Sequence, residues 1–188
     1  MDVIKSRRSV GKVKPQMPPR EVIERMLEAA TYAPNHHEVE PWRFIVLAGN
    51  AREELGVLME QVLREKMTET ESEKAQAALA KERAKPCRAP VVIAVASLRP
   101  QQPKIKDIEN IEAVAAAVQN MLLVAEEEGV ATIWRSGDSS YDPRVKAFFG
   151  LEPEEHVVGL VYVGYPAIPK PERTPTPFLE KTEWRGWD

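Results

Sequence analysis

The sequence predicts one layered domain of mixed helices and strands, of the α/β or α+β class. A chain of 188 residues, 43% of them hydrophobic, can bury one substantial core. Segments with the spacing of amphipathic helices alternate with short apolar runs of strand length. Several connections between these runs are long enough to be helical, and this pattern is typical of layered domains.

The first half of the chain predicts helices around one strand. Residues 22–30 carry apolar side chains on one face, so a helix is expected that ends before Pro34. The run WRFIVLAG at 42–49 predicts a strand that a Gly-Asn turn closes. Residues 51–66 return to helical spacing. The stretch 68–85 is rich in Glu, Lys and Ala, which favours a solvated peripheral helix over a mobile flap above a pocket.

The second half alternates strands with one long helix. The run PVVIAVASL at 90–98 is continuously apolar, as expected for a strand covered on both faces. A helix is predicted over about 107–128, with small residues that let another backbone approach closely. Two further strands are predicted at 130–134 and 156–166, with a short helix between them that Asp142 caps.

The last segment, 166–188, predicts an extended arm. The chain holds 16 prolines, where an average composition would place about nine. Five of them fall between Pro166 and Pro177. Each proline removes a backbone donor, so this segment cannot form a helix or a central strand. An arm that cannot pair along its own length gains most by lying across a partner, and we therefore expect an obligate homodimer.

Composition argues against several kinds of partner. A net charge of −3 gives no reason to expect a nucleic-acid partner. The single cysteine, Cys87, excludes an internal disulfide, suits a reducing compartment, and is expected to be packed rather than nucleophilic. No apolar run approaches 18 residues, and residues 1–30 carry no signal core. We therefore expect a cytoplasmic protein that does not enter a membrane.

Three stretches carry the candidate site residues. SRRSV at 6–10 offers two guanidinium groups and a hydroxyl, which suit a phosphate, although such a tripeptide is more often a solvated turn. TIWRSGD at 132–138 puts an aromatic face, a cation and free N–H groups at one sheet edge, which suits a flat ligand. A buried Trp134 beside a surface Arg135 is the alternative interpretation. YAPNHHEVEPW at 32–42 holds two of the three histidines directly before a strand.

The histidines do not predict a metal site. His36 and His37 are adjacent, so they cannot bind one metal as residues four apart on a helix would, and His156 lies far away in the sequence. The glycine-rich fingerprints of the common dinucleotide and P-loop sites are absent. No serine elbow marks a nucleophile. An aromatic and imidazole wall around a planar ligand is the other interpretation of the histidine stretch.

Taken in order, RRSV, APNHHEVEPWRFIVL, GVATIWRSGD and VGLVYVGYP resemble the FMN-dependent nitroreductase family, with the shorter, bacterial YdjA-like branch as the best match. The resemblance covers most of 3–178 and fails mainly at 68–85 and in the last ten residues. It implies an α+β fold, a nitroreductase-like three-layer sandwich with a mostly antiparallel central sheet flanked by helices. It also implies one FMN-binding domain over 1–188 and a domain-swapped homodimer that exchanges terminal arms such as 166–188.

The resemblance further implies a flavoprotein oxidoreductase with FMN at the dimer interface. NADH or NADPH would reduce the flavin, which would then reduce nitroaromatic, quinone or related small-molecule electron acceptors in a ping-pong cycle through N5. The flavin carries this chemistry, so no catalytic acid or base is expected among the side chains. A non-catalytic FMN-binding or redox-sensing protein remains an alternative, as do reductive dehalogenation and flavin destruction on the same fold.

Nine residues are implied as cofactor-binding. Arg7 and Ser9, with Arg8 between them, are expected to hold the ribityl phosphate. Tyr32 and His36 are expected to line the flavin from the other subunit. The edge formed by Trp134, Arg135, Ser136 and Gly137 is expected to cover one flavin face. The backbone N–H groups near Ser136 are expected to approach the flavin N5.

Two further contacts of the family have no secure counterpart. A basic residue near the C-terminus often contacts the phosphate, and neither Lys181 nor Arg185 matches well enough to be assigned. A lysine that often contacts the flavin pyrimidine has only Lys12 close to its position.

Overall fold

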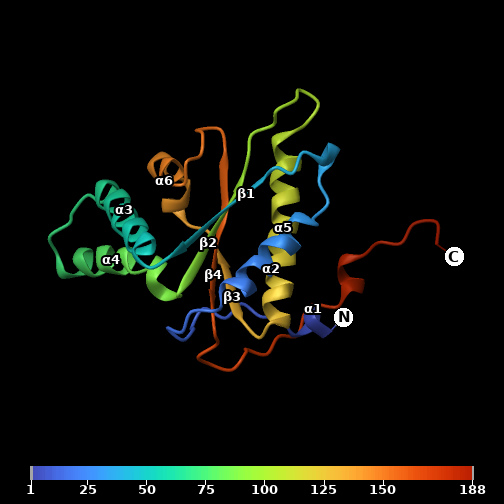
Figure 1. Ribbon diagram of the computed structural model, residues 1–188, viewed down its shortest axis with the longest axis horizontal. Coiled ribbons are helices and arrows are strands. Elements are labelled where there is room, and N and C mark those ends of the chain that lie inside the picture. The colour runs from blue at the N-terminus through green and yellow to red at the C-terminus, as the bar shows by residue number, and fades with distance from the viewer. Residues whose placement is uncertain (1, 188) are drawn as a thin grey trace.

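Four antiparallel strands form the central sheet (Figure 1). The structure, a computed structural model, describes residues 2–187. Side by side, the strands lie in the order β1 (Trp42–Ala48), β2 (Val91–Ser97), β4 (His156–Gly164) and β3 (Ala131–Arg135). The two inner strands, β2 and β4, send alternate side chains into two apolar layers, and this is why both read as continuous apolar runs.

Helices cover both faces of the sheet (Figure 1). On one face lie α2 (Arg20–Thr31) and α5 (Asp107–Glu127), which pack on the alternate valines and isoleucine of β2. On the other face lie α3 (Asn50–Lys66) and the short α6 (Pro143–Phe148). The predicted α+β class, with an antiparallel sheet between helical layers, is confirmed.

The charged stretch after α3 forms a helix, as predicted. This helix, α4 (Glu73–Arg83), packs on the outside of α3. The two helices approach so closely that a Cβ on Gly56 would lie 2.2 Å from the carbonyl oxygen of Arg83. One side of α4 is therefore buried, and Glu82 lies on that side with only 7% of its surface exposed.

Helix α5 is long and apolar enough to cross a membrane by length and composition alone. The expectation that no such segment exists was therefore too strict. The apolar character of α5 has a packing explanation, since Val114, Val118 and Met121 are fully buried against the sheet. A central helix of a globular core passes the same test.

The two terminal segments meet at one edge of the sheet. After α1 (Asp2–Ser6), Ser9 pairs with Thr132 in a parallel bridge, and Val13 pairs with Pro166 in an antiparallel one. Beyond this bridge the C-terminal arm runs past α1 and away from the body (Figure 1). Its residues 171–187 are all exposed, and one 3₁₀ turn, Phe178–Lys181, interrupts it. The last residue of the predicted arm, Asp188, lies outside the described residues.

Two local predictions were wrong. No Gly-Asn turn closes β1, because Gly49 has a φ of +53° and passes directly into α3, which Asn50 begins. A left-handed glycine makes this abrupt change of direction possible. The thiol of Cys87 is exposed rather than packed, because the 3₁₀ turn Pro86–Arg88 carries it outside the layer before β2 begins.

Candidate functional site

The N-terminal segment lies along the edge strand that ends in Trp134 and Arg135. The backbone N–H of Val10 donates to the carbonyl of Thr132 at 2.9 Å, beside the bridge between Ser9 and Thr132. Two of the three candidate stretches, far apart in the sequence, are thus side by side.

Residue Glu126, near the end of α5, fastens this segment. Its carboxylate accepts a hydrogen bond from Ser6 Oγ at 2.6 Å and pairs with Lys170 at the base of the arm. Partial burial acts to raise the pKa of Glu126, but the contacts with Lys170 and Ser6 and the nearby charge of Arg7 outweigh it, so the pKa lies below its usual value. The carboxylate is therefore ionised at neutral pH and joins the N-terminus, α5 and the arm.

The neighbouring arginines, Arg7 and Arg8, have different surroundings. The guanidinium of Arg8 donates to the carbonyl of Lys5 at 2.6 Å and to that of Pro171 at 3.0 Å. Arg8 thus holds the arm to the N-terminal segment. Within residues 2–187, the side chain of Arg7 makes no hydrogen bond or ion pair, so its donors are available to a ligand.

The side chains of Trp134 and Arg135 point to opposite faces of the sheet. The indole lies over Gly159, where a Cβ would be 1.9 Å from Nε1, and Nε1 donates to the carbonyl of Val158 at 3.3 Å. The guanidinium of Arg135 lies 5.8 Å from the ring centre of Tyr162, in the layer below α3. Successive strand residues alternate in this way. These two side chains therefore cannot cover the same face of one flat ligand. The edge predicted to cover one flavin face can use the side chain of Trp134 or that of Arg135, but not both.

The backbone after Arg135 does offer donors at the sheet edge. Within residues 2–187, the N–H groups of Ser136 and Gly137 have no backbone acceptor, because β3 has ended and the next hydrogen bond runs from Ser140 to Gly137. The prediction of free N–H groups near Ser136 therefore agrees with the structure.

Tyr32 and His36 lie away from this edge. Tyr32 follows α2 and is 78% exposed. The imidazole of His36 is 3.9 Å from the carboxylate of Glu109, at the start of α5. From Glu109 to Glu126 the helix rises by about 25 Å at 1.5 Å per residue. Within one subunit, His36 and Arg7 therefore cannot contact the same small ligand.

The loop that carries His36 has an unusual backbone. His37, Glu38 and Glu40 have φ values of 54°, 53° and 47°, a left-handed region that non-glycine residues rarely adopt. The side chain of Asn35 supports the loop by accepting a hydrogen bond from the N–H of Glu40 at 2.9 Å. Left-handed non-glycine residues cluster at functional sites, where surrounding contacts maintain the strain.

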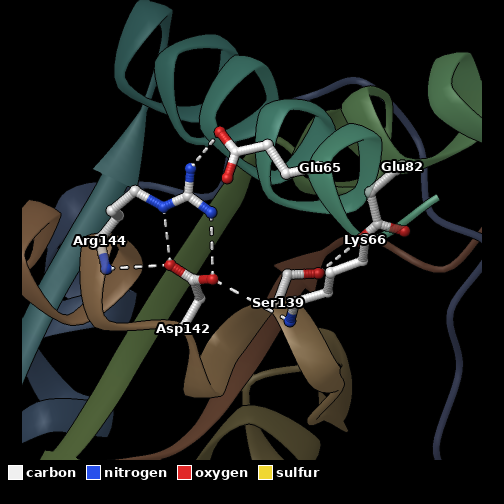
Figure 2. Close-up of polar contacts among 6 residues, drawn as sticks. All are labelled: Glu65, Lys66, Glu82, Ser139, Asp142 and Arg144. Atoms are coloured by element: carbon white, nitrogen blue, oxygen red, sulfur yellow. Dashed lines mark hydrogen bonds and ion pairs between the residues drawn. The ribbon is translucent and has the colours of Figure 1, made fainter. Parts of the chain in front are cut away.

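A polar network holds the loop that follows Gly137 (Figure 2). Asp142 caps α6 by accepting from the N–H of Arg144 at 3.0 Å. The guanidinium of Arg144 returns to Asp142 at 3.0 Å and reaches Glu65 on α3 at 2.7 Å. The hydrogen bond from Arg144 is the main reason that the pKa of Asp142 lies below its usual value.

The other side of the same loop is held from α4. Ser139 Oγ donates to Glu82 at 2.5 Å, and Lys85 pairs with the same carboxylate (Figure 2 shows the first contact). Sequence reasoning missed Glu82, because a glutamate in a charged helix carries no signal of burial until its partner is known. No group of three histidine, cysteine or acidic residues arranged to hold a metal ion occurs in the described part of the chain.

Residues 4–165 match the model of the family described as "Nitroreductase family". The chain belongs to the nitroreductase family. The predicted family and enzyme class, an oxidoreductase of the nitroreductase type, are confirmed.

Two curated nitroreductases are similar over nearly their whole length. The chain is 31% identical to "Putative NAD(P)H nitroreductase YfhC" of Bacillus subtilis (strain 168), covering 96% of this chain and 91% of that protein. It is 30% identical to "Putative NAD(P)H nitroreductase YdjA" of Escherichia coli (strain K12), covering 95% and 97%.

Solved nitroreductase structures share the fold. A nitroreductase-like protein from Bacillus cereus is 30% identical, with a TM-score of 0.81 over 99% of this chain and 95% of that chain. A nitroreductase from Bacteroides fragilis NCTC 9343, solved with bound FMN, is 25% identical, with a TM-score of 0.73 over 94% of each chain.

Proposed function

We propose that this nitroreductase binds FMN and uses NADH or NADPH to reduce nitroaromatic, quinone or related small-molecule acceptors. The observation that carries the proposal is the pairing of the Arg7–Ser9 segment with the edge strand β3. This pairing puts the guanidinium and hydroxyl groups that we propose for the phosphate near one end of a strand and backbone donors at the other. The FMN bound to the Bacteroides fragilis protein and the NAD(P)H nitroreductase names of the curated relatives support the same assignment.

The residues at this edge fit a flavin phosphate. Arg7 is without an ion-pair partner among residues 2–187, and Ser9 adds a hydroxyl two residues later. A guanidinium and a hydroxyl make strong, charge-assisted hydrogen bonds to a phosphate. Arg8 contributes indirectly, because its hydrogen bond to Pro171 holds the backbone that carries both groups.

Beyond the phosphate, the edge offers an apolar surface and directed donors. Trp134 is 37% exposed and its indole lies over Gly159, so its exposed part can offer an apolar surface to a planar ring. The free N–H groups of Ser136 and Gly137 can donate to a ring nitrogen, and fixed donors stabilise developing negative charge without reorganising. Bound FMN supplies the hydride chemistry at N5.

We infer that two copies of the chain complete the site. Arg7 and His36 lie at opposite ends of α5, so they can meet at one ligand only across an interface between copies. Helix α5 has a stripe suited to such an interface, with residues spaced three or four apart, of which Ile108, Glu112 and Gln119 are exposed and Ala116 and Leu123 are half-buried. The arm exposes Phe178, Leu179, Trp184 and Trp187, which a partner would cover.

The spectrum of the purified protein tests the proposal. We expect flavin absorption that bleaches under anaerobic NADH or NADPH and returns when a nitroaromatic or quinone is added. A yellow protein that neither nucleotide bleaches would instead be an FMN store or sensor. A sedimentation mass of one chain with FMN bound would contradict the two-subunit site.

A further inference from the structure

One hydrogen bond holds the middle of the loop that follows β3. In the described part of the chain, residues 136–141 make a single hydrogen bond to another segment, from Ser139 Oγ to Glu82 on α4 at 2.5 Å (Figure 2). Inside the loop, the N–H of Ser140 donates to the carbonyl of Gly137 at 2.8 Å. The loop is otherwise hydrogen-bonded at its two ends, by β3 and by the cap of α6. The place of the 3₁₀ turn in its middle therefore depends on α4.

This contact buries a carboxylate. Glu82 is 7% exposed, and Ser139 is equally buried. A carboxylate removed from water is stable only where a paired charge and hydrogen bonds replace the water. Lys85 supplies the paired charge, and Ser139 supplies the hydrogen bond. A hydroxyl that donates to a carboxylate makes a short, strong hydrogen bond, so the turn is held at a defined place.

The turn follows directly after the backbone donors of the proposed site. The free N–H groups belong to Ser136 and Gly137, which precede Ser139 by three and two residues. The carbonyl of Gly137 is bonded to Ser140, the neighbour of Ser139, so a shift of Ser139 moves Gly137 with it. A displacement of about 1 Å at a reacting site can cost about 100-fold in rate, even when its cause lies far from the chemistry.

The reaction of the proposed function depends on the direction of these donors. Reduction by NAD(P)H transfers two electrons and one proton to the flavin, leaves NAD(P)⁺ and adds one negative charge to the flavin ring. Donors whose direction is fixed in advance stabilise developing charge without reorganising. Donors on a loop without support must first be ordered, and the reaction becomes slower.

We propose that Glu82 is a positioning residue for flavin reduction. Through its hydrogen bond to Ser139, it holds the turn so that the N–H groups before the turn keep one direction. Glu82 acts through Ser139 and not by contact with the reacting atoms. This proposal rests on the proposed function. It gives the charged helix α4 a role in the reaction, although both residues lie outside every motif that resembles the family.

Amide hydrogen exchange in the apoprotein tests the structural half of the proposal without any measurement of activity. Ser139→Ala removes the hydrogen bond but leaves Glu82 paired with Lys85, so the variant should fold. The N–H of Ser140, which donates within the turn, should lose protection about tenfold in Ser139→Ala and in Glu82→Ala, because one hydrogen bond that supports the turn is gone. Parent protection in both variants would overturn the proposal.

Anaerobic stopped-flow bleaching of bound FMN, with the nucleotide that reduces the parent, tests the functional half. Both variants should lower the limiting rate of bleaching by about 10- to 100-fold. The Kd for FMN and the half-saturating concentration of the nucleotide should stay near the parent values, because Arg7 and Ser9 still hold the phosphate. The double variant should be no slower than the slower single variant, since both changes remove the same hydrogen bond.

Glu82→Gln provides a rescue. Its amide oxygen can still accept from Ser139, so this variant should keep much of the rate that Glu82→Ala loses. If Glu82→Gln and Glu82→Ala are equally slow while Ser139→Ala keeps the parent rate, the charge of Glu82 matters and the hydrogen bond does not. That result would overturn the positioning role.

Glu60→Gln is the matched control. Glu60 also carries a negative charge between α3 and α4, where it pairs with Arg64 and Arg83, and it makes no hydrogen bond to the loop in the described part of the chain. This variant should keep both the protection of Ser140 and the parent rate of bleaching. Equal effects of Glu60→Gln and Ser139→Ala would overturn the proposal, because the loop would then depend only on the packing of α4.

Two results separate this proposal from the proposed function. Lower protection of Ser140 with an unchanged rate of bleaching would overturn the positioning role and leave the proposed function intact. A parent protein that binds no FMN would contradict the proposed function, and this proposal with it.

Discussion

The two ends of α5 hold the two halves of the proposed site, and the contacts that hold them differ. At the C-terminal end, Glu126 binds Ser6 and Lys170, and Arg8 reaches the carbonyl of Pro171. Ionic and hydrogen-bonding contacts thus fasten the segment that carries Arg7. This half is assembled by the subunit alone.

At the N-terminal end of α5 the support is weaker. His36 is exposed and only 3.9 Å from Glu109, and its loop has three left-handed residues after it. Each such conformation costs about 1–3 kcal/mol unless its surroundings maintain it. One half of the proposed site is thus fastened within the chain, whereas the other half presents strained, exposed groups that we propose a partner subunit covers.

The largest expected effect concerns the fastened half. Arg7→Ala should weaken FMN binding by about 30- to several-thousand-fold, because removing one partner of a desolvated charge pair costs about 2–5 kcal/mol. Riboflavin, which lacks the phosphate, should bind the parent poorly and be almost indifferent to the change. Fluorescence titration of apoprotein with both ligands measures this.

Arg8→Ala is the matched control, since its guanidinium already binds backbone carbonyls. It should weaken FMN binding far less than Arg7→Ala. If the two variants behave alike, or if Arg7→Ala weakens riboflavin as much as FMN, the phosphate lies elsewhere.

A mixed dimer tests both ends together. His36→Ala should weaken FMN binding about tenfold, the effect of losing roughly 1.4 kcal/mol. When Arg7→Ala and His36→Ala proteins are mixed and allowed to exchange subunits, each mixed dimer should regain one intact site. The regained site is measured as FMN bound by the mixture at an FMN concentration that is too low for binding to either variant alone. No regain on confirmed subunit exchange would place both halves of the site within one chain.

The pH dependence of stability sharpens the comparison at Glu126. Its pKa is below the usual value of 4.5 in the folded chain, so the unfolded chain takes up this proton first as pH falls. The stabilising contribution is therefore complete above about pH 4.5 and is lost as the pH falls through the lower folded pKa. Urea unfolding at several pH values should show that Glu126→Gln flattens this dependence. Glu127→Gln, an exposed neighbour, should leave it unchanged.

The smallest expected effect is spectroscopic. If Trp134 packs on the flavin, its emission is quenched in the holoprotein and recovers when FMN is removed. Trp134→Phe should therefore reduce the recovery of emission on FMN release, while the remaining three tryptophans still contribute. If the variant recovers as much emission on FMN release as the parent does, Trp134 does not contact the flavin, and its indole only packs over Gly159.

Much of the fold could be predicted because it depends on local patterns. The continuous apolar run of β2 and the apolar stripe of α2 each identify an element without its neighbours. The proline-rich segment likewise predicts an exposed chain from backbone chemistry alone. The errors came at positions whose conformation or exposure depends on the surrounding structure. Gly49 leads directly into a helix, and Cys87 faces solvent.

The candidate site was predictable only in part. The order of four motifs identified the family, and the pairing of Ser9 with Thr132 brings two of them together. The sequence did not reveal that the side chains of Trp134 and Arg135 point to opposite faces of the sheet at this edge. It also did not reveal Glu82, because burial of a carboxylate depends on a partner more than fifty residues away, Ser139.

By itself, the sequence determined the identity and order of the helices and strands, the extended arm and the family, because periodicity, proline chemistry and motif order are properties of neighbouring residues. Only the tertiary structure decided which side chains share a space. It placed Arg7 and His36 at opposite ends of α5, and it brought Ser139 to the buried carboxylate of Glu82. Such distances follow from how layers pack, and packing is settled by contacts between residues far apart in the chain.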